Sequence, residues 1–358
     1  MGVFFVLLLV PMMMQHIAIK GYHIDYEKRS RFAMAFFFCG FTALVMLRHE
    51  SIGNDTRNYI HFFEKYSRME WSRVGVGEVE KGFAYFNKLV SVISKEPHFF
   101  LAATAAVTSI MIYPTYKRLC TDASLTIVLF CTISTFVLMF SGIRQMLAIG
   151  IGFIAYDYTR NKKLFRFVIT VVVAMSFHTS AFMLAFMYPM YHARITKKWL
   201  LVVVPVLAVM FLLNQQIFSV LAAIMERFTK YEGDMASTGA YTMLILFAMF
   251  TVFAFLIPQD SLLDSETIGL RNFLLLVLGL QMFAPLHELA MRMNYYYIIF
   301  VPLLLPKIIQ HRSKRWNQVA VAGRHVMVAF FLVYFFMDAY RGGSLHVFPY
   351  HFFWETIG

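Results

Sequence analysis

The stretch 141-SGIRQMLAIGIG-152 joins two long apolar runs, residues 124–140 and 146–158. Runs of this kind recur along the whole chain, which predicts a series of transmembrane helices. Arg144 stands at the start of the second run. An arginine at mid-membrane costs at least about 2.5–3.5 kcal/mol, so it needs a protein partner, a water-filled cavity or an anionic ligand. The pattern therefore indicates a helical membrane protein with a polar cavity.

The composition supports this class of protein. The chain is 59% hydrophobic and 15% charged, with a mean hydropathy of +0.63, against about 25% charged residues in soluble domains. Continuous rather than alternating apolar runs disfavour a β-barrel. The net charge of +12 is explained by lysines and arginines in cytoplasmic loops, so nucleic acid is not expected as a partner. The three cysteines have no metal-ligand spacing.

We predict an all-α transmembrane bundle with about twelve spans, forming one integral membrane domain over residues 1–358. The expected spans are 2–19, 32–47, 98–116, 124–140, 143–158, 165–177, 179–191, 199–216, 240–257, 270–286, 295–310 and 322–337. The spans 165–177 and 179–191 are too short to cross alone, because 13 residues of helix cover about 20 Å of a core near 30 Å. His178 lies between them.

The charge distribution predicts the orientation. If the basic loop 20–31 is cytoplasmic, the cytoplasmic connections hold 19 of the 32 lysines and arginines, in agreement with the positive-inside rule. Both termini then lie on the outer face. That face also carries a long loop with amphipathic helices after span 2, residues 48–97, and an aromatic tail, residues 338–358.

Several polar residues on the predicted outer face are candidates for chemistry. Arginine presents a planar fork of donors that matches phosphate, so the set suggests an anionic ligand held by Arg144 and Arg292. Asp55, Glu80 or His178 would accept a proton. Each has an alternative reading, in which Asp55 caps a helix, Glu80 is a solvated helix start and His178 is structural. Glu288 and Arg292 have the spacing of a helical ion pair.

Tyrosines 295–297 have the character of a membrane-interface belt, with Tyr295 as a candidate ligand contact. Other chemistries lack their sequence signals. The chain has no P-loop, no DxD pair in the outer loops and no HExxH motif, which disfavours ATP hydrolysis, a metal-held nucleotide sugar and a zinc protease.

The order of motifs resembles the EpsG family of Wzy-like bacterial exopolysaccharide and O-antigen polymerases. It runs from Arg48 and GNDT through Tyr59 to 80-EKGF-83, then to 142-GIRQMLAIGI-151, 177-FHTSA-181 and Arg292. The matched positions also include Asp55, Arg144, Gln145 and His178. Asn54 stands where the common G-T-D pattern has threonine, which affects the turn and leaves the carboxylate of Asp55 in place.

The resemblance implies a GT-C-like, metal-independent membrane glycosyltransferase without a cofactor. Its partners would be an undecaprenyl-pyrophosphate-linked oligosaccharide, the membrane lipid, a chain-length regulator and a flippase. It implies catalytic roles for Asp55, Glu80 and His178. It further implies binding roles for Arg48, Tyr59, Arg144, Gln145, Arg292 and Tyr295. The expected location is the bacterial inner membrane, with the active site facing the periplasm.

Three other functions share these features. They are a lipid-linked oligosaccharide flippase or transporter, an O-antigen-type ligase and a membrane acyltransferase. A flippase needs charge along both halves of its cavity, because the diphosphate must cross. The embedded arginines here cluster on one predicted side, which favours the polymerase.

Overall fold

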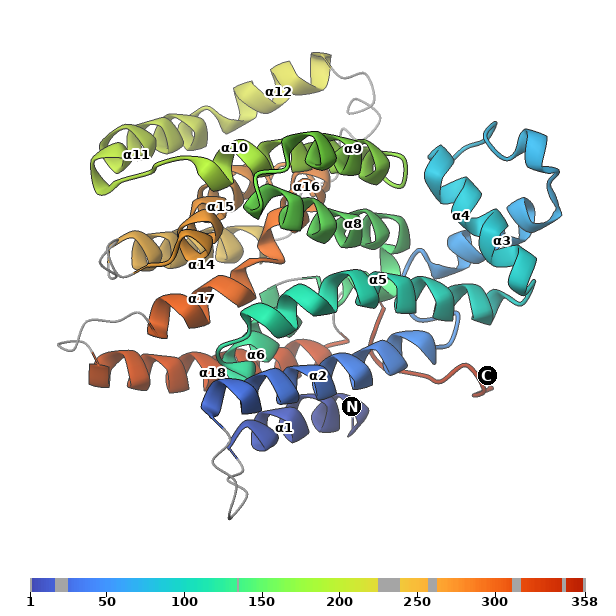
Figure 1. Cartoon of the computed structure of the whole chain (residues 1–358), viewed down its shortest axis with the longest axis horizontal. Coiled ribbons are helices and arrows are strands. Elements are labelled where there is room, and N and C mark those ends of the chain that lie inside the picture. The colour runs from blue at the N-terminus through green and yellow to red at the C-terminus, as the bar shows by residue number, and fades with distance from the viewer. Residues whose placement is uncertain are drawn as a thin grey trace. The chain divides into compact units, whose positions relative to one another are not determined.

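Helices are the main regular structure in the residues that the computed structural model describes, and these residues contain one isolated β-bridge, between Arg48 and Phe352. The described residues are 2–16, 25–133, 135–224, 239–256, 263–310, 317–342 and 346–356. The chain divides into two compact units, which we describe separately: unit 1 is Met1–Leu184 with Val321–Gly358, and unit 2 is Ala185–Ala320. Figure 1 shows the order of the helices.

The helices of unit 1 cover most of the predicted apolar runs and also include two helices within the predicted outer loop 48–97. They are α1 (Gly2–His16), α2 (Tyr26–Met46), α3 (Thr56–Arg68), α4 (Lys81–Ile93), α5 (Pro97–Leu119), α6 (Ala123–Ile133), α7 (Leu138–Ser141), α8 (Ile143–Arg160), α9 (Leu164–Met175) and most of α18 (Asn317–Tyr340). The helix α8 contacts α5 and α9, and most of its side chains are buried.

The helices of unit 2 surround α15. They are α10 (Met187–His192), α11 (Lys197–Leu212), α12 (Asn214–Ile224), α14 (Gly239–Leu256), α15 (Ser265–Gln281), α16 (Glu288–Ile298) and α17 (Val301–Gln310). The 3₁₀ helix Thr179–Phe186 leads into this unit. Arg271 of α15 is 1% exposed. Its guanidinium lies 4.4 Å from the ring centroid of Phe255 and donates to the carbonyl of Ile195 at 3.2 Å.

Several predicted runs are interrupted. The run 124–140 is not one helix, because α6 ends at Ile133 and α7 begins only at Leu138. The run 199–216 is bent by 74° between α11 and α12, and the run 295–310 by 44° between α16 and α17. The segment 179–191 is a 3₁₀ helix followed by six residues of α-helix. The prediction that 165–177 and 179–191 are too short to cross alone is confirmed.

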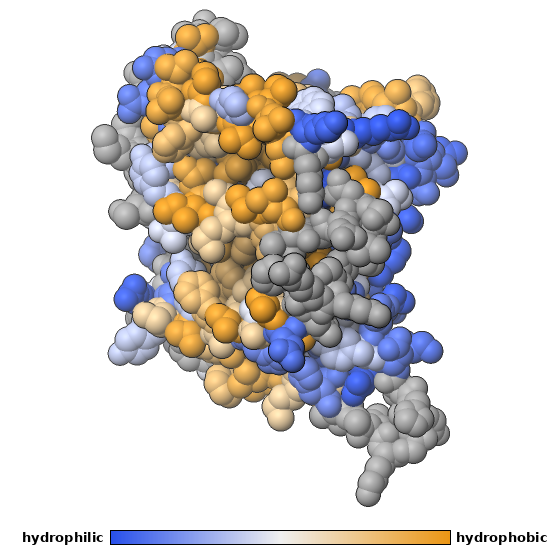
Figure 2. All heavy atoms as spheres, turned by 90° about the vertical axis from the view of Figure 1, so that its left-hand side faces the viewer, coloured by the Kyte–Doolittle hydropathy of each residue, from blue (hydrophilic) through white to orange (hydrophobic). Residues whose placement is uncertain are grey.

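The structure supports a helical membrane protein. In the described part of the chain, four helices are long and apolar enough to cross a membrane, and the number rises to six if each bent pair is one span. The four are α2, α5, α14 and α18. Figure 2 shows hydrophobic side chains over much of one face. The predicted total of twelve spans, the GT-C-like arrangement and the single domain stay predictions.

An aromatic core holds the α3–α4 region on unit 1. Phe63 of α3 stacks on Phe100 of α5 with ring centroids 4.7 Å apart. Phe83 of α4 packs edge-on against Tyr59 at 5.8 Å. The predicted outer loop 48–97 is therefore a folded element with two helices, and its buried faces lie against α5 and α8.

Candidate functional site

The candidate site is built around the carboxylate of Glu80, at the start of α4. One of its oxygens accepts from Arg144 Nη1 at 2.7 Å. The other accepts from the backbone N–H of Thr179 at 3.0 Å and from its hydroxyl at 2.9 Å. His178 Nδ1 lies 3.6 Å from the same oxygen. The structure thus brings together three motifs that are far apart in the sequence.

The close approach of α4 to the turn after α9 explains the glycine of 80-EKGF-83. A Cβ on Gly82 would lie 2.2 Å from the side-chain oxygen of Ser176 and 2.7 Å from its carbonyl oxygen. The backbone N–H of Phe83 donates to that carbonyl at 3.3 Å. Any larger residue at position 82 would push α4 away from Ser176. The glycine therefore allows Glu80 to reach Thr179.

The loop that carries Asp55 docks on the break before α8. Gly53 has φ of +89°, and a Cβ there would lie 2.3 Å from the carbonyl oxygen of Phe140. The hydroxyl of Thr56 donates to the same oxygen at 3.1 Å. The backbone N–H of Asp55 donates to Ser141 Oγ at 3.3 Å. The backbone of Asp55 is thus held next to Ser141, which is three residues before Arg144.

The side chain of Asp55 does not cap its helix. It occupies the position before α3, yet it makes no capping hydrogen bond. Within the described residues, no ion pair or hydrogen bond of its carboxylate is present. The capping interpretation of Asp55 is therefore wrong, and the carboxylate is available for another role.

Glu80, by contrast, is fully engaged. Its side chain is 13% exposed, so the interpretation as a solvated helix start is wrong. Burial by itself would raise the pKa of Glu80, but the Arg144 guanidinium and the backbone hydrogen bonds, including the one from Thr179, outweigh it and hold the pKa below its usual value. The group is a carboxylate at neutral pH. With both oxygens occupied, it is better suited to position Arg144 than to accept a proton.

Arg144 is held in place but stays partly exposed. Its guanidinium lies 5.8 Å from the ring centroid of Tyr59. Its side chain is 25% exposed, whereas its Nε is buried and makes no hydrogen bond within the described residues. A partly exposed guanidinium that Glu80 orients is suited to bind an anion. Gln145, the next residue, is 4% exposed in the core of unit 1.

Arg48 lies beneath the C-terminal tail, in a different environment from Arg144. It is 1% exposed, and its Nη1 donates to the carbonyl of Val45 at 2.5 Å. Its backbone forms the bridge with Phe352. The structure does not bring the Arg48 guanidinium into the Glu80 cluster, and its predicted binding role stays a prediction.

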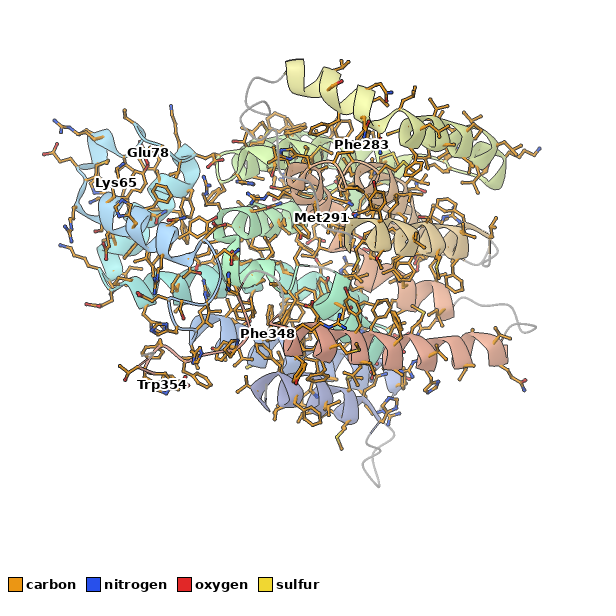
Figure 3. The ribbon with its side chains drawn as sticks, turned by 180° about the vertical axis from the view of Figure 1, so that it is seen from behind. Lys65, Glu78, Phe283, Met291, Phe348 and Trp354 are labelled. Atoms are coloured by element: carbon orange, nitrogen blue, oxygen red, sulfur yellow. The ribbon has the colours of Figure 1, made fainter. Side chains whose placement is uncertain are left out.

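The aromatic tail pairs through its backbone with the loop that precedes α3. His351 O accepts from His49 N at 2.9 Å, and Leu47 O accepts from Phe353 N at 2.9 Å. His346 O accepts from Gly53 N at 3.1 Å. Figure 3 shows the tail with Phe348 and Trp354 labelled, and it also shows Lys65 and Glu78 in the α3–α4 region. The tail therefore holds the loop that carries Asp55.

Arg292 and Tyr295 belong to α16 of unit 2. The side chain of Arg292 is exposed, and that of Tyr295 is partly buried. Tyr296 and Tyr297 are 1% and 0% exposed, so the interpretation of 295–297 as an interface belt is wrong for these two residues. The side chain of Glu288 lies outside what the structure describes. The predicted shared role of Arg292 with Arg144 stays a prediction.

The fold and the site define a helical membrane protein with a partly buried Glu–Arg pair beside a free carboxylate. The family model for the EpsG family matches residues 31–352, and the chain belongs to this family. The match includes every candidate site residue and most of the tail. No curated protein and no solved structure matches the chain.

Proposed function

We propose that the protein is a polysaccharide polymerase. It transfers a glycan from an undecaprenyl-pyrophosphate-linked oligosaccharide to a sugar hydroxyl of a second lipid-linked repeat unit. Membership of the EpsG family supports polysaccharide biosynthesis at a membrane. The observation that carries the reaction is the Glu80–Arg144 pair at 2.7 Å, because it orients a guanidinium for a diphosphate.

In this scheme the bond from the donor sugar to the diphosphate oxygen breaks, and a new bond forms to the acceptor hydroxyl oxygen. The lipid diphosphate leaves with the negative charge. Arg144 stabilises that charge most strongly as it develops, which lowers the barrier of the chemical step. Arg292 is the second cation of the proposal. The reaction needs no metal or nucleotide.

Asp55 takes the acceptor proton. Its carboxylate is free of capping and of ion pairs within the described residues, whereas both oxygens of Glu80 are occupied. This distinction ranks Asp55 above Glu80 as the general base. His178, 3.6 Å from Glu80, supports the orientation of the pair.

The proposal places the reaction at the periplasmic face of the inner membrane, in a single membrane domain with twelve spans and a GT-C-like arrangement. The loop 48–97 and the tail 338–358 lie on the periplasmic side. A flippase would supply the lipid-linked units and a chain-length regulator would set their number. Gln145, Tyr59, Arg48 and Tyr295 are further contacts for the glycan or diphosphate.

The test is polymerisation by the purified protein in lipid nanodiscs with lipid-linked repeat units, read as a gel ladder. Asp55→Asn removes the base and should lower the rate by about 10²–10⁴-fold. Arg144→Ala should lower it by about 10²–10³-fold or more. The control is Arg57→Gln, which alters an exposed side chain 3.9 Å from Glu50 and should leave the ladder unchanged. A normal ladder from Arg144→Ala would refute the proposed role of this residue.

A further inference from the structure

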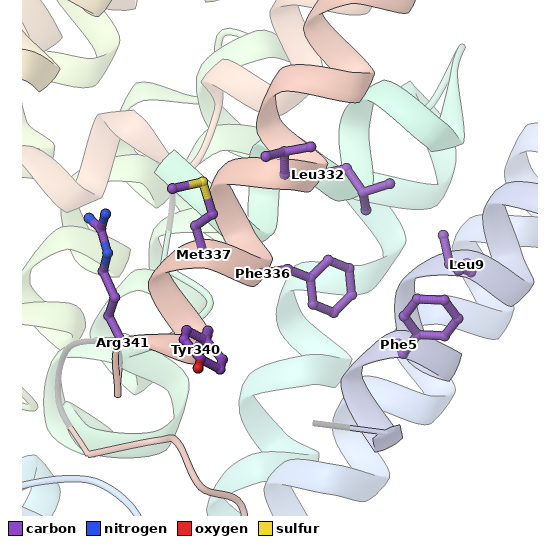
Figure 4. Close-up of a pocket in the computed structure, with 8 residues that line it drawn as sticks. Phe5, Leu9, Leu332, Phe336, Met337, Tyr340 and Arg341 are labelled. Atoms are coloured by element: carbon purple, nitrogen blue, oxygen red, sulfur yellow. The ribbon is translucent and has the colours of Figure 1, made fainter.

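A groove of about 630 Å³ lies between α1 and α18 in unit 1. Phe5 and Leu9 of α1 form one wall, and Leu332, Val333 and Phe336 of α18 form the other. Figure 4 shows Phe336 directed toward Phe5 across the groove, with ring centroids 5.6 Å apart. The volume is within the range of about 300–1,000 Å³ that is usual for small-molecule sites.

The groove changes character along its length. From Leu332 to Met337 its lining is apolar, and it ends at Tyr340 and Arg341. Tyr340 is 86% exposed, and the side chain of Arg341 is also exposed. Leu332 and Tyr340 are eight residues apart on one helix, which corresponds to about 12 Å. The groove is thus apolar along most of its length and has a cationic side chain at one end.

The cationic end of the groove is the end nearest to the candidate site along the chain. His346 is five positions after Arg341, and its carbonyl oxygen accepts from the backbone N–H of Gly53 at 3.1 Å. Five steps from residue to residue span at most about 18 Å. Gly53 is two residues from Asp55 in the same loop. A ligand head group at Arg341 would therefore lie within reach of the site by way of an extended glycan.

We propose that this groove binds the hydrocarbon chain of a polyprenyl phosphate lipid, with Arg341 against the phosphate. The inference rests on the proposed function and extends it, because it gives one of the two lipid-linked substrates a binding site distinct from Arg144. The occupant follows from the lining. An apolar chain fits the walls from Leu332 to Met337, and an anionic head fits the single arginine at the end.

No segment of the chain that the structure describes covers the lining of the groove. Val333 is 57% exposed, Phe5 is 54% exposed and Met337 is 49% exposed. The opposite side of α18 is buried, with Phe331, Phe335 and Ala339 at 3–4% exposure. The helix is therefore already packed on one side, while the groove side remains open to an apolar chain.

The experiment uses the full chain in nanodiscs with a diazirine-bearing undecaprenyl phosphate, followed by mass spectrometry of the labelled peptides. We expect labelling concentrated in residues 2–16 and 317–342. An excess of undecaprenyl phosphate without the diazirine should abolish this labelling, whereas the same excess of phosphatidylglycerol should not. Leu332→Trp fills the groove and should abolish the labelling. Arg341→Gln should weaken it by about fivefold, which corresponds to about 1 kcal/mol.

Two variants serve as matched controls. Val326→Trp enlarges a side chain of α18 that is 66% exposed and does not line the groove. Arg57→Gln removes an exposed cation elsewhere in unit 1. Both should label like the unmodified protein.

Labelling that spreads evenly over all exposed helices, or that phosphatidylglycerol displaces equally well, would show ordinary membrane lipid in the groove and overturn the inference. The polymerisation assay separates this result from a failure of the proposed function. Absent groove labelling with a normal ladder refutes the groove alone. Specific labelling without any ladder from the unmodified protein refutes the proposed function instead.

Discussion

At the scale of single residues, Glu80 connects motifs that the sequence presents as separate. It binds Arg144, which is 64 positions away, and Thr179, which is 99 positions away. Glu80, Arg144 and His178 can each be recognised as candidates from the sequence, because a polar group near an apolar run is costly unless a partner or a ligand offsets the cost. Their contacts with one another cannot be recognised in this way, because no periodicity relates residues that lie on different helices.

The first prediction concerns the charge of Glu80. Glu80→Gln keeps the shape and the acceptor oxygen for Thr179, but it removes the negative charge that holds Arg144. We expect chain lengthening to fall by about 10²-fold or more, while the fold persists. The measurement is the gel ladder together with thermal unfolding in detergent.

The control for this variant is Glu78→Gln, two residues earlier. Glu78 pairs with Lys65 at 2.9 Å, and its side chain is 70% exposed. Solvent screens an exposed pair of this kind, so it contributes little to stability, and activity and stability should hardly change. Equal loss of activity in both variants would mean that the α3–α4 region responds to any loss of charge, and the specific role of Glu80 would be refuted.

The second prediction concerns pH. The pKa of Glu80 is lower in the folded protein than the usual value of 4.5 for a glutamate. The stabilisation by its charge is therefore complete above about pH 4.5 and is lost as the pH falls through the lower folded value. We expect the Glu80→Gln variant and the unmodified protein to differ in unfolding temperature by a constant amount from pH 8 to pH 6. Their difference should shrink only in strong acid. A difference that disappears between pH 7 and pH 6 would contradict the low pKa.

At the scale of helices, the sequence predicts where they lie better than where they break. Apolar periodicity and length locate both ends of α5, α8 and α14 within about three residues, whereas α2 begins six residues before the predicted span. The sequence between α6 and α7 contains no glycine or proline that would indicate the break. The break depends on tertiary packing around Phe136, which contacts the rings of Phe41 and Phe335.

The third prediction tests the contact between α4 and the turn at Ser176. Gly82→Ala introduces a Cβ at 2.2 Å from Ser176 Oγ and 2.7 Å from its carbonyl oxygen. The backbone must move, so Glu80 should lose Thr179 and chain lengthening should fall steeply. Gly323→Ala is the matched control, because a Cβ there meets nothing within 4 Å. A fully active Gly82→Ala variant would show that this close approach is not required.

The fourth prediction concerns a polar cluster that joins four helices of unit 1. Arg324 of α18 pairs with Asp122 before α6, and it donates to Tyr26 of α2 at 3.2 Å. Gln15 of α1 donates to Asp122 at 3.2 Å. The side chains of Arg324 and Asp122 are 13% and 9% exposed. Removing one partner leaves the other charge with little solvent, so Asp122→Asn should destabilise unit 1 by about 3 kcal/mol.

Thermal unfolding in detergent measures this effect. The double variant Asp122→Asn with Arg324→Gln should be less destabilised than the sum of the single variants, because neither charge is then left alone. Glu27→Gln is the control. Glu27 pairs with Arg31 at 45% exposure on both sides, so its loss should cost less than about 1 kcal/mol. Strict additivity of the two single variants would refute the coupling.

At the scale of the whole molecule, the sequence predicts a membrane protein but does not reveal how its ends are used. The tail 346–355 returns to the loop 47–53, about 300 positions earlier, through backbone hydrogen bonds. Tyr350 adds a hydrogen bond to the carbonyl of Leu44 at 2.6 Å. Contacts of such long range leave no local pattern in the chain. The sequence shows that the tail is rich in aromatic residues, but it does not show that the tail supports the loop that carries Asp55.

The orientation in the membrane is the last prediction, and it depends on the unequal distribution of lysine and arginine. The connection 159–166 contains four such residues and is predicted to be cytoplasmic, whereas the loop 48–97 is predicted to face outward. Lys163 is exposed, and Val76 is 79% exposed. In a Cys39→Ser background, Val76→Cys should react with a membrane-impermeant maleimide applied to spheroplasts. Lys163→Cys should react only after permeabilisation. The buried Cys120 and Cys131 provide a low background. The reverse labelling pattern would place Glu80, Arg144 and Asp55 on the cytoplasmic side, where a periplasmic polymerase site is impossible.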